Sequence, residues 1–155
     1  MSILQRIAVA GLSLSAAGMI GIAVHEGYRP GTYDDGVGVN TIGFGTTAGV
    51  RLGDRIDPVS ALVRLGQDVS EMERGLAKCI KVPLYQHEWD AYVSWTYNVG
   101  VGAACGSTLV RMLNAGDYAG ACNQLSRWTY AGGRQLAGLV KRREQERRLC
   151  LWGAT

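Results

Sequence analysis

The feature that most constrains this chain is an uncharged stretch of 18 residues, from Ile7 to Val24. Arg6 precedes it, and His25 and Glu26 follow it. As a helix it would be about 27 Å long, slightly shorter than a hydrocarbon core of roughly 30 Å. Ten of the 18 residues are Ala, Gly or Ser. The segment is therefore apolar enough to be recognised for export, but lipid holds it weakly.

Three interpretations of this segment compete. The first is a permanent membrane anchor, the second is a cleaved signal peptide, and the third is an anchor that later leaves the bilayer and joins the folded domain. Gly21-Ile22-Ala23 is a weak small-x-small cleavage site. We favour the third interpretation, because cleavage there would leave Glu26 at a frayed terminus. Arg6 predicts an N-in, C-out orientation.

The chain has four cysteines, separated by 26, 17 and 28 residues: Cys79, Cys105, Cys122 and Cys150. No CxxC motif occurs, and the two histidines lack ligand spacing, so we expect no metal site. An even number of cysteines after an export signal favours two disulfides, with three connectivities open. We favour Cys79–Cys105 and Cys122–Cys150, each enclosing a helical hairpin. Four buried thiols are the alternative.

The remaining sequence predicts one α+β domain that is mainly α. Five glycines between residues 31 and 45 alternate with β-favouring residues, which predicts a small β element. Asp57-Pro58 predicts the start of a long helix. We expect further helices over about 86–97, from Ser107 to Gly116, from Asp117 to about Trp128, and over 138–151, with a loop at 130–133.

Composition limits the partners of the protein. The net charge of +3 and a pI near 8.8 suit an acidic polymer or a membrane surface, but fall short of the basic footprint of nucleic-acid binding. We therefore expect no nucleic-acid partner. From Arg127 to Arg148 there are seven basic residues, and a solvated basic helix face is the simpler interpretation of them.

Candidate catalytic groups lie just after the uncharged segment. Glu26 follows an apolar helix, whose end would desolvate its carboxyl and favour the protonated form that a general acid needs. Asp35 lies in a polar, glycine-rich turn and should stay ionised. Two carboxyls with opposed environments suit glycosidic cleavage. Thr41 would hold a water molecule through its hydroxyl. The spacing alone does not exclude Asp34 in place of Asp35.

The string HEGYRPGTYDDGVGVNTIGFGTT, from His25 to Thr47, resembles the catalytic stretch of the phage lysozymes, the endolysin family of glycoside hydrolases. The family pattern is Glu, eight residues, Asp, five residues, then Thr-Ile-Gly-x-Gly. YNVGVGAACGSTLVRMLNAGDYAGACNQLSRWTYAGG and GLVKRREQERRLCLWG resemble the later segments of the family, so the similarity runs from about residue 24 to the end. It implies a lysozyme-like fold, with a small glycine-rich β-hairpin lobe and a helical C-terminal lobe.

By the same resemblance, Glu26 is the general acid, Asp35 positions or activates water, and Thr41 assists it. The implied reaction is inverting hydrolysis of the MurNAc–GlcNAc β-1,4 bond of peptidoglycan by a monomer that needs no cofactor. Tyr33, Asn98, Arg142 and Arg143 are candidates for contacting the saccharide, or, for an arginine, Glu26. Many relatives have His where Thr46 stands, so an ion pair made by that histidine is in doubt here.

The N-terminal segment resembles that of the endolysins with a signal-anchor-release (SAR) sequence. This implies an N-terminal SAR helix within residues 1–24, followed by a catalytic domain over 25–155. The enzyme would be tethered and inactive in the host inner membrane until a holin or pinholin depolarises it, and would then be freed into the periplasm. No cysteine precedes Cys79, so blocking of a catalytic cysteine by a disulfide is absent.

Three other functions remain open. A secreted wall hydrolase would have its signal peptide removed. A lytic transglycosylase would dispense with Asp35. A non-catalytic wall-binding module would be free to lose Glu26, Asp35 or Thr41.

Overall fold

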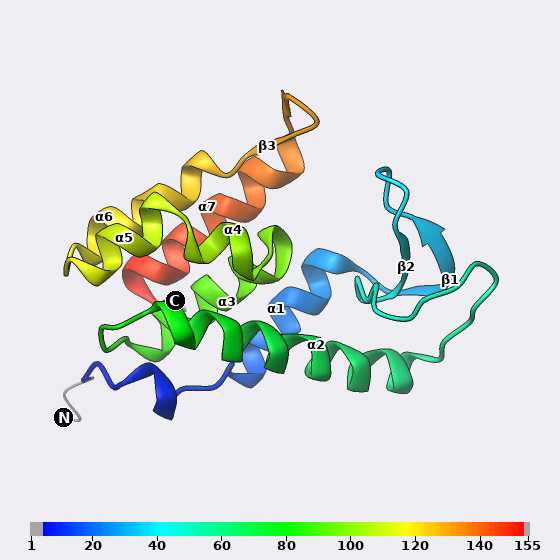
Figure 1. Ribbon diagram of the computed structural model, residues 1–155, viewed down its shortest axis with the longest axis horizontal. Coiled ribbons are helices and arrows are strands. Elements are labelled where there is room, and N and C mark those ends of the chain that lie inside the picture. The colour runs from blue at the N-terminus through cyan, green and yellow to red at the C-terminus, as the bar shows by residue number, and fades with distance from the viewer. Residues whose placement is uncertain (1–4, 154–155) are drawn as a thin grey trace.

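The computed structural model describes residues 5–153 and divides them into a small β lobe and a larger helical lobe (Figure 1). In the β lobe, β1 (Arg29–Asp34) pairs antiparallel with β2 (Asn40–Gly43). Tyr33 lies opposite Thr41 in this ladder, and the register shifts between Arg29 and Tyr33. The sequence placed this hairpin at 31–45, so its start two residues earlier is a small correction.

The long helix α2 (Pro58–Cys79) connects the two lobes and runs across the lower part of Figure 1, above the N-terminal segment. It begins at the predicted cap, where the Asp57 side chain accepts hydrogen bonds from the Val59 and Ser60 backbone N–H groups. Its apolar stripe is buried at Ala61, Leu65, Val69 and Leu76. This stripe attaches the helix to both lobes and fixes their relative position.

The helical lobe is built around α3 (Gln86–Val99), which is buried over most of its length. Around it lie α4 (Val101–Cys105), α5 (Thr108–Asn114), α6 (Tyr118–Gln124), the 3₁₀ helix η2 (Leu125–Arg127) and α7 (Ala137–Trp152). Trp89 and Trp95 belong to the core, and Trp128 packs edge-on against Trp95 at 5.2 Å between ring centroids. Trp152 is exposed. The mainly helical α+β fold predicted from the sequence is confirmed.

One predicted loop is a hairpin. β3 (Tyr130–Ala131) pairs with β4 (Arg134–Gln135), and the turn between them is made by Gly132 and Gly133, both with positive φ. The sequence indicates only a loop at 130–133, because strands of two residues leave too little alternation to detect.

The uncharged N-terminal segment is not a single helix. Ile7 forms an isolated antiparallel bridge with Leu84, a short 3₁₀ helix η1 covers Val9–Gly11, and only α1 (Ala16–Glu26) is α-helical. Within residues 5–153, the structure has no helix long and apolar enough to span a bilayer. The expected N-terminal helix is therefore reduced to α1, which begins where the Ser15 side chain accepts a hydrogen bond from Gly18 N–H.

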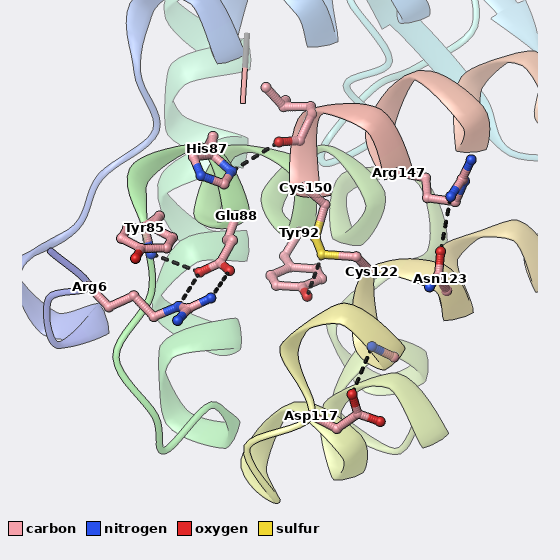
Figure 2. The surroundings of a disulfide bond; sticks show 12 residues. Arg6, Tyr85, His87, Glu88, Tyr92, Asp117, Cys122, Asn123, Arg147 and Cys150 are labelled. Atoms are coloured by element: carbon pink, nitrogen blue, oxygen red, sulfur yellow. Dashed lines mark hydrogen bonds and ion pairs between the residues drawn. A yellow bond between two sulfur atoms is a disulfide. The ribbon is translucent and has the colours of Figure 1, made fainter. Parts of the chain in front are cut away.

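Polar contacts fix the N-terminal segment to the helical lobe. Arg6 donates two hydrogen bonds to Glu88, at 3.1 and 2.8 Å, and lies over the Tyr85 ring (Figure 2). Ser15 N–H donates to Asp90 Oδ1 at 3.0 Å. Bidentate arginine–carboxylate pairs of this kind are among the stronger polar contacts in proteins. The segment is therefore an integral part of the folded domain.

Two disulfides, Cys79–Cys105 and Cys122–Cys150, lie in the helical lobe, and the pairing is the one favoured from the sequence. The first joins the end of α2 to α4, and the second joins α6 to α7 (Figure 2). Each closes a loop of more than 25 residues, which stabilises a domain by roughly 3–4 kcal/mol in the chain-entropy model. Both bonds tie helices around α3.

Candidate active site

A cleft of about 420 Å³ opens between the two lobes. The three residues predicted to carry the chemistry, Glu26, Asp35 and Thr41, all line it. They come from the end of α1, the turn after β1, and β2. The rest of the lining is Tyr33, Gly45, Thr47, Ala48, Asp68, Glu71, Met72, Tyr97 and Asn98.

Glu26 is the last residue of α1, and Gly27 ends the helix with a φ of +69°. Buried Ile22 anchors the helix one turn earlier. The Glu26 side chain is 20% exposed, and its Oε1 accepts a hydrogen bond from Arg142 at 2.8 Å. A Cβ at Gly45 would lie 3.0 Å from Glu26 Oε2, so the glycine leaves room for the carboxyl. The sequence predicts a desolvated carboxyl at this helix end, with Arg142 or Arg143 as a candidate contact, and the structure has Arg142 there.

Asp35 and Asp34 have different positions, and only Asp35 lies at the cleft. Asp34 Oδ1 accepts hydrogen bonds from the N–H groups of Gly36 and Gly38, and Asp34 does not line the cleft. Asp35 lines the cleft, and only its Oδ1 is bound to the turn, by the N–H groups of Val37 and Val39. The glycine-rich turn therefore presents Asp35 toward the other lobe.

Thr41 lies opposite Tyr33 on the hairpin, and little of it is exposed. Its hydroxyl donates to the Val39 carbonyl oxygen at 3.1 Å. Because a hydroxyl has one proton and two lone pairs, this bond leaves Thr41 Oγ1 free to accept a hydrogen bond from water. The arrangement suits a residue that orients water beside Asp35.

Of the four candidates for contacting saccharide, Tyr33 and Asn98 line the cleft. Arg142 and Arg143 do not line it and lie behind its wall. Arg142 contacts Glu26, whereas Arg143, with a relative exposure of 0%, contacts Asn98 and the Trp128 carbonyl oxygen. Helical periodicity does not show which of two adjacent arginines faces inward, and here both do.

Two tyrosines of the cleft have raised pKa values. Burial raises the pKa of Tyr97, whose hydroxyl donates to the Phe44 carbonyl oxygen at 2.9 Å, and the charges of Asp68 and Glu26 add to the effect. Burial also raises the pKa of Tyr33, with Glu26 contributing. Both phenols stay neutral at physiological pH and act as hydrogen-bonding groups.

The wall formed by α2 was missed in the sequence. Asp68, Glu71 and Met72 line the cleft, and Asp68 accepts a hydrogen bond from the Thr46 hydroxyl. The uncharged Thr46 hydroxyl thus forms a hydrogen bond with Asp68 at the position where a histidine could form an ion pair. The positions at 68, 71 and 72 lie within one turn of a predicted helix, but nothing in the sequence shows that this turn faces the β hairpin.

His25, beside Glu26, is held neutral. Burial lowers its pKa to about 4, and the charges of Arg142 and Arg143 contribute. As for metals, the part of the chain from 5 to 153 contains no group of three or more His, Cys, Asp or Glu residues placed to hold an ion.

Carboxyl groups from both lobes face one cleft, with Glu26 at the end of α1 and Asp35 in the turn after β1, and this arrangement suits glycosidic cleavage. The phage lysozyme family model matches residues 23–146, and the chain belongs to this family. It is 43% identical over 129 residues to a SAR-endolysin of bacteriophage PS119 and to one of enterobacteria phage P21; the alignments cover 83% of this chain and 77% and 78% of those proteins. The resemblance stated from the sequence is confirmed.

A solved structure of a phage endolysin has the same fold as this chain. The endolysin of Escherichia coli O157:H7 phage FAHEc1 is 34% identical and superposes with a TM-score of 0.83, covering 93% of this chain and 96% of that one.

Proposed function

We propose that this protein is a phage endolysin that hydrolyses the β-1,4 bond between N-acetylmuramic acid and N-acetylglucosamine in peptidoglycan, with inversion and without a cofactor. The observation that carries the proposal is the shared cleft of Glu26, Asp35 and Thr41. Membership of the lysozyme family makes a glycosidase with peptidoglycan as its substrate the natural assignment.

In this mechanism the Glu26 carboxyl donates its proton to the glycosidic oxygen as the bond breaks. Asp35 accepts a proton from the attacking water, which Thr41 orients through its free lone pair. Arg142, at 2.8 Å, stabilises the carboxylate that Glu26 becomes. Tyr33 and Asn98 contact the saccharide. Water attacks the face of the sugar opposite the leaving group, so the configuration at the anomeric carbon is inverted.

Product analysis tests this reaction. Purified enzyme acting on cell walls should yield a reducing-end N-acetylmuramic acid, whereas a 1,6-anhydro sugar would identify a lytic transglycosylase. Absence of any product would identify a wall-binding module. Glu26→Gln should abolish cleavage and leave the fold intact, and substantial residual activity would remove Glu26 as the acid.

We further propose that the enzyme is exported as a monomer tethered N-in, C-out through residues 7–24, and is freed into the periplasm when a holin or pinholin depolarises the host inner membrane. In this scheme residues 1–24 are the signal-anchor-release segment and 25–155 the catalytic domain. The names of the two SAR-endolysins above support it. The uncharged sequence of the segment and its polar docking contacts give physical support.

Tethering accounts for inactivity in this scheme. Glu26 closes α1, and α1 includes residues of the tether. While the segment lies in lipid, α1 cannot pack against α3, and Glu26 is kept out of the cleft. Fractionation before and after depolarisation tests the scheme: the uncut chain should move from the membrane to the soluble fraction, and wall-cleaving activity should appear only after that move. A shortened soluble product would indicate a cleaved signal peptide, and retention in the membrane a permanent anchor.

A further inference from the structure

The carboxylate of Glu146, on α7, is almost completely buried, with a relative exposure of 2%. Its Oε1 accepts hydrogen bonds from Ser94 Oγ at 2.8 Å and from Arg142 Nε at 3.1 Å. Its Oε2 pairs with Arg143 Nη1. A buried charge is tolerated only when paired and hydrogen-bonded, and Glu146 meets both conditions.

The two arginines bound to Glu146 extend to two different points of the cleft. Arg142 Nη1 reaches Glu26 Oε1 at 2.8 Å, while its Nη2 donates to the Ser94 carbonyl oxygen at 3.1 Å. Arg143 Nη2 donates to Asn98 Oδ1. Glu26 and Asn98 both line the cleft. One carboxylate therefore supports two cleft residues through one arginine each.

Charge makes this arrangement depend on Glu146. Arg142 and Arg143 are adjacent like charges in a poorly solvated region, and burial lowers the pKa of Arg143 whereas Glu146 raises it. Arginine side chains have many rotamers, so fixing two of them requires anchors along their length. Without Glu146 the guanidinium groups would repel each other and seek solvent.

We propose that Glu146 is a positioning residue of the reaction, which holds the Glu26 carboxyl through Arg142 and the Asn98 side chain through Arg143 in their working geometry. The inference rests on the proposed function for the role of Glu26. It assigns to one group that never touches the saccharide an effect on both proton transfer and substrate binding. Displacement of a reacting group by about 1 Å can cost about a hundredfold in rate.

Glu146→Gln tests the proposal. The amide oxygen can still accept from Ser94 and Arg142, but the amide nitrogen cannot accept from Arg143. We expect kcat to fall at least about tenfold and KM to rise, because both cleft residues are displaced. The alkaline limb of the pH profile should also move to lower pH, because Arg142, no longer offset by a carboxylate, favours ionised Glu26. The other titratable groups that line the cleft are unchanged: Tyr33, Asp35, Asp68, Glu71 and Tyr97.

Glu144→Gln is the matched control. Glu144 pairs with Arg147 and Arg148 on the same helix, at the same spacings of three and four residues, but on the solvent side. This variant should keep the kcat, KM and pH profile of the parent. Loss of folded protein alone would lower the apparent kcat of Glu146→Gln and leave its KM and pH profile unchanged, so that result overturns the proposal.

Glu146→Asp covers the case in which Glu146→Gln does not fold. It keeps the charge but withdraws the carboxylate by one methylene, so kcat should fall and KM rise while the alkaline limb stays in place. Parental kcat and KM in this variant would overturn the proposal.

Glu26→Gln assayed in parallel separates the two hypotheses: if it is inactive while Glu146→Asp is fully active, the positioning role fails and the proposed function stands. If Glu26→Gln is active, the proposed function fails.

Discussion

Arg142 Nη1 donates to Glu26 Oε1 at 2.8 Å and so joins α7, the last α-helix among residues 5–153, to the end of α1, the first α-helix there. The placement of Glu26 thus depends on two segments that are 116 residues apart. Its backbone position requires α1 to pack on the domain, and its side-chain orientation requires α7. Any process that withdraws α1 from the domain therefore also withdraws Glu26, the proposed general acid, from the cleft.

Asp35→Asn should distinguish the role of Asp35 from that of Asp34 in the same turn. The amide oxygen of the substituted side chain can still accept hydrogen bonds from the N–H groups of Val37 and Val39, so the turn is preserved. The amide cannot take a proton from water, so the proposed general base is lost. We expect kcat for wall hydrolysis to fall by about a hundredfold or more. Asp34→Asn is the control, because Asp34 only caps the turn, and it should retain activity. Equal losses in both variants would show that turn geometry, rather than the Asp35 carboxylate, is what matters.

The position of His25 makes stability depend on pH. Its pKa is lowered to about 4 in the folded protein, against an ordinary value of 6.5. Between these values the unfolded chain binds a proton that the folded chain does not, so the free energy of unfolding decreases as pH falls from about 6.5 toward 4. Above pH 6.5 the histidine is neutral in both the folded and the unfolded chain, so it does not contribute to the pH dependence of the free energy of unfolding.

His25→Gln should therefore remove part of the loss of stability in that pH range. Urea unfolding midpoints measured at several pH values from 4 to 8 would check this, with His87→Gln as a second variant. The decrease in the urea unfolding midpoint between pH 6.5 and 4 should be smaller in His25→Gln than in the parent. Parallel curves for the parent and His25→Gln would mean that the pKa of His25 does not differ between the folded and unfolded states.

The Arg6–Glu88 pair should determine how firmly the N-terminal segment docks. Arg6→Ala removes a bidentate pair and the stacking of its guanidinium over Tyr85 and Tyr118. We expect a loss of about 1–2 kcal/mol from the local opening free energy of the segment. Hydrogen exchange of the Ile7 N–H, which donates to the Leu84 carbonyl oxygen at 2.9 Å, should become about tenfold faster.

Arg111→Ala, at an exposed position on α5 away from the segment, is a suitable control and should leave that exchange rate unchanged. Unchanged exchange in Arg6→Ala would show that the Ile7–Leu84 bridge and the contacts of Ser15 hold the segment without the ion pair.

Much of the fold and of the site could be predicted from the sequence. The cap at Asp57, the hairpin glycines and the spacing of Glu26, Asp35 and Thr41 are local signals, and each places a residue within its own element. What could not be predicted depends on packing between elements. The facing of Asp68 and Glu71 into the cleft, the inward direction of both Arg142 and Arg143, and the division of residues 7–24 into a bridge, a 3₁₀ turn and a short helix are all set by distant partners.

The small residues of the N-terminal segment provide the last prediction, because the structure distinguishes two glycines of α1. A Cβ at Gly21 meets nothing within 4 Å, whereas a Cβ at Gly18 would lie 2.6 Å from Leu14 Cδ1 and 3.1 Å from Asp90 Cγ. Leucine at either position adds about 0.5 kcal/mol of preference for the bilayer. Only at Gly18 does it also obstruct docking.

Both Gly21→Leu and Gly18→Leu should therefore delay release from the membrane, as measured by the fraction of chain recovered in the soluble fraction after depolarisation. Detergent-extracted Gly21→Leu should have parental wall-cleaving activity, since its docked state is undisturbed. Gly18→Leu should lose activity as well, because α1 no longer packs closely enough against Asp90 to place Glu26 in the cleft. If Gly18→Leu released on time and kept full activity, the docking of α1 would not control the position of the acid.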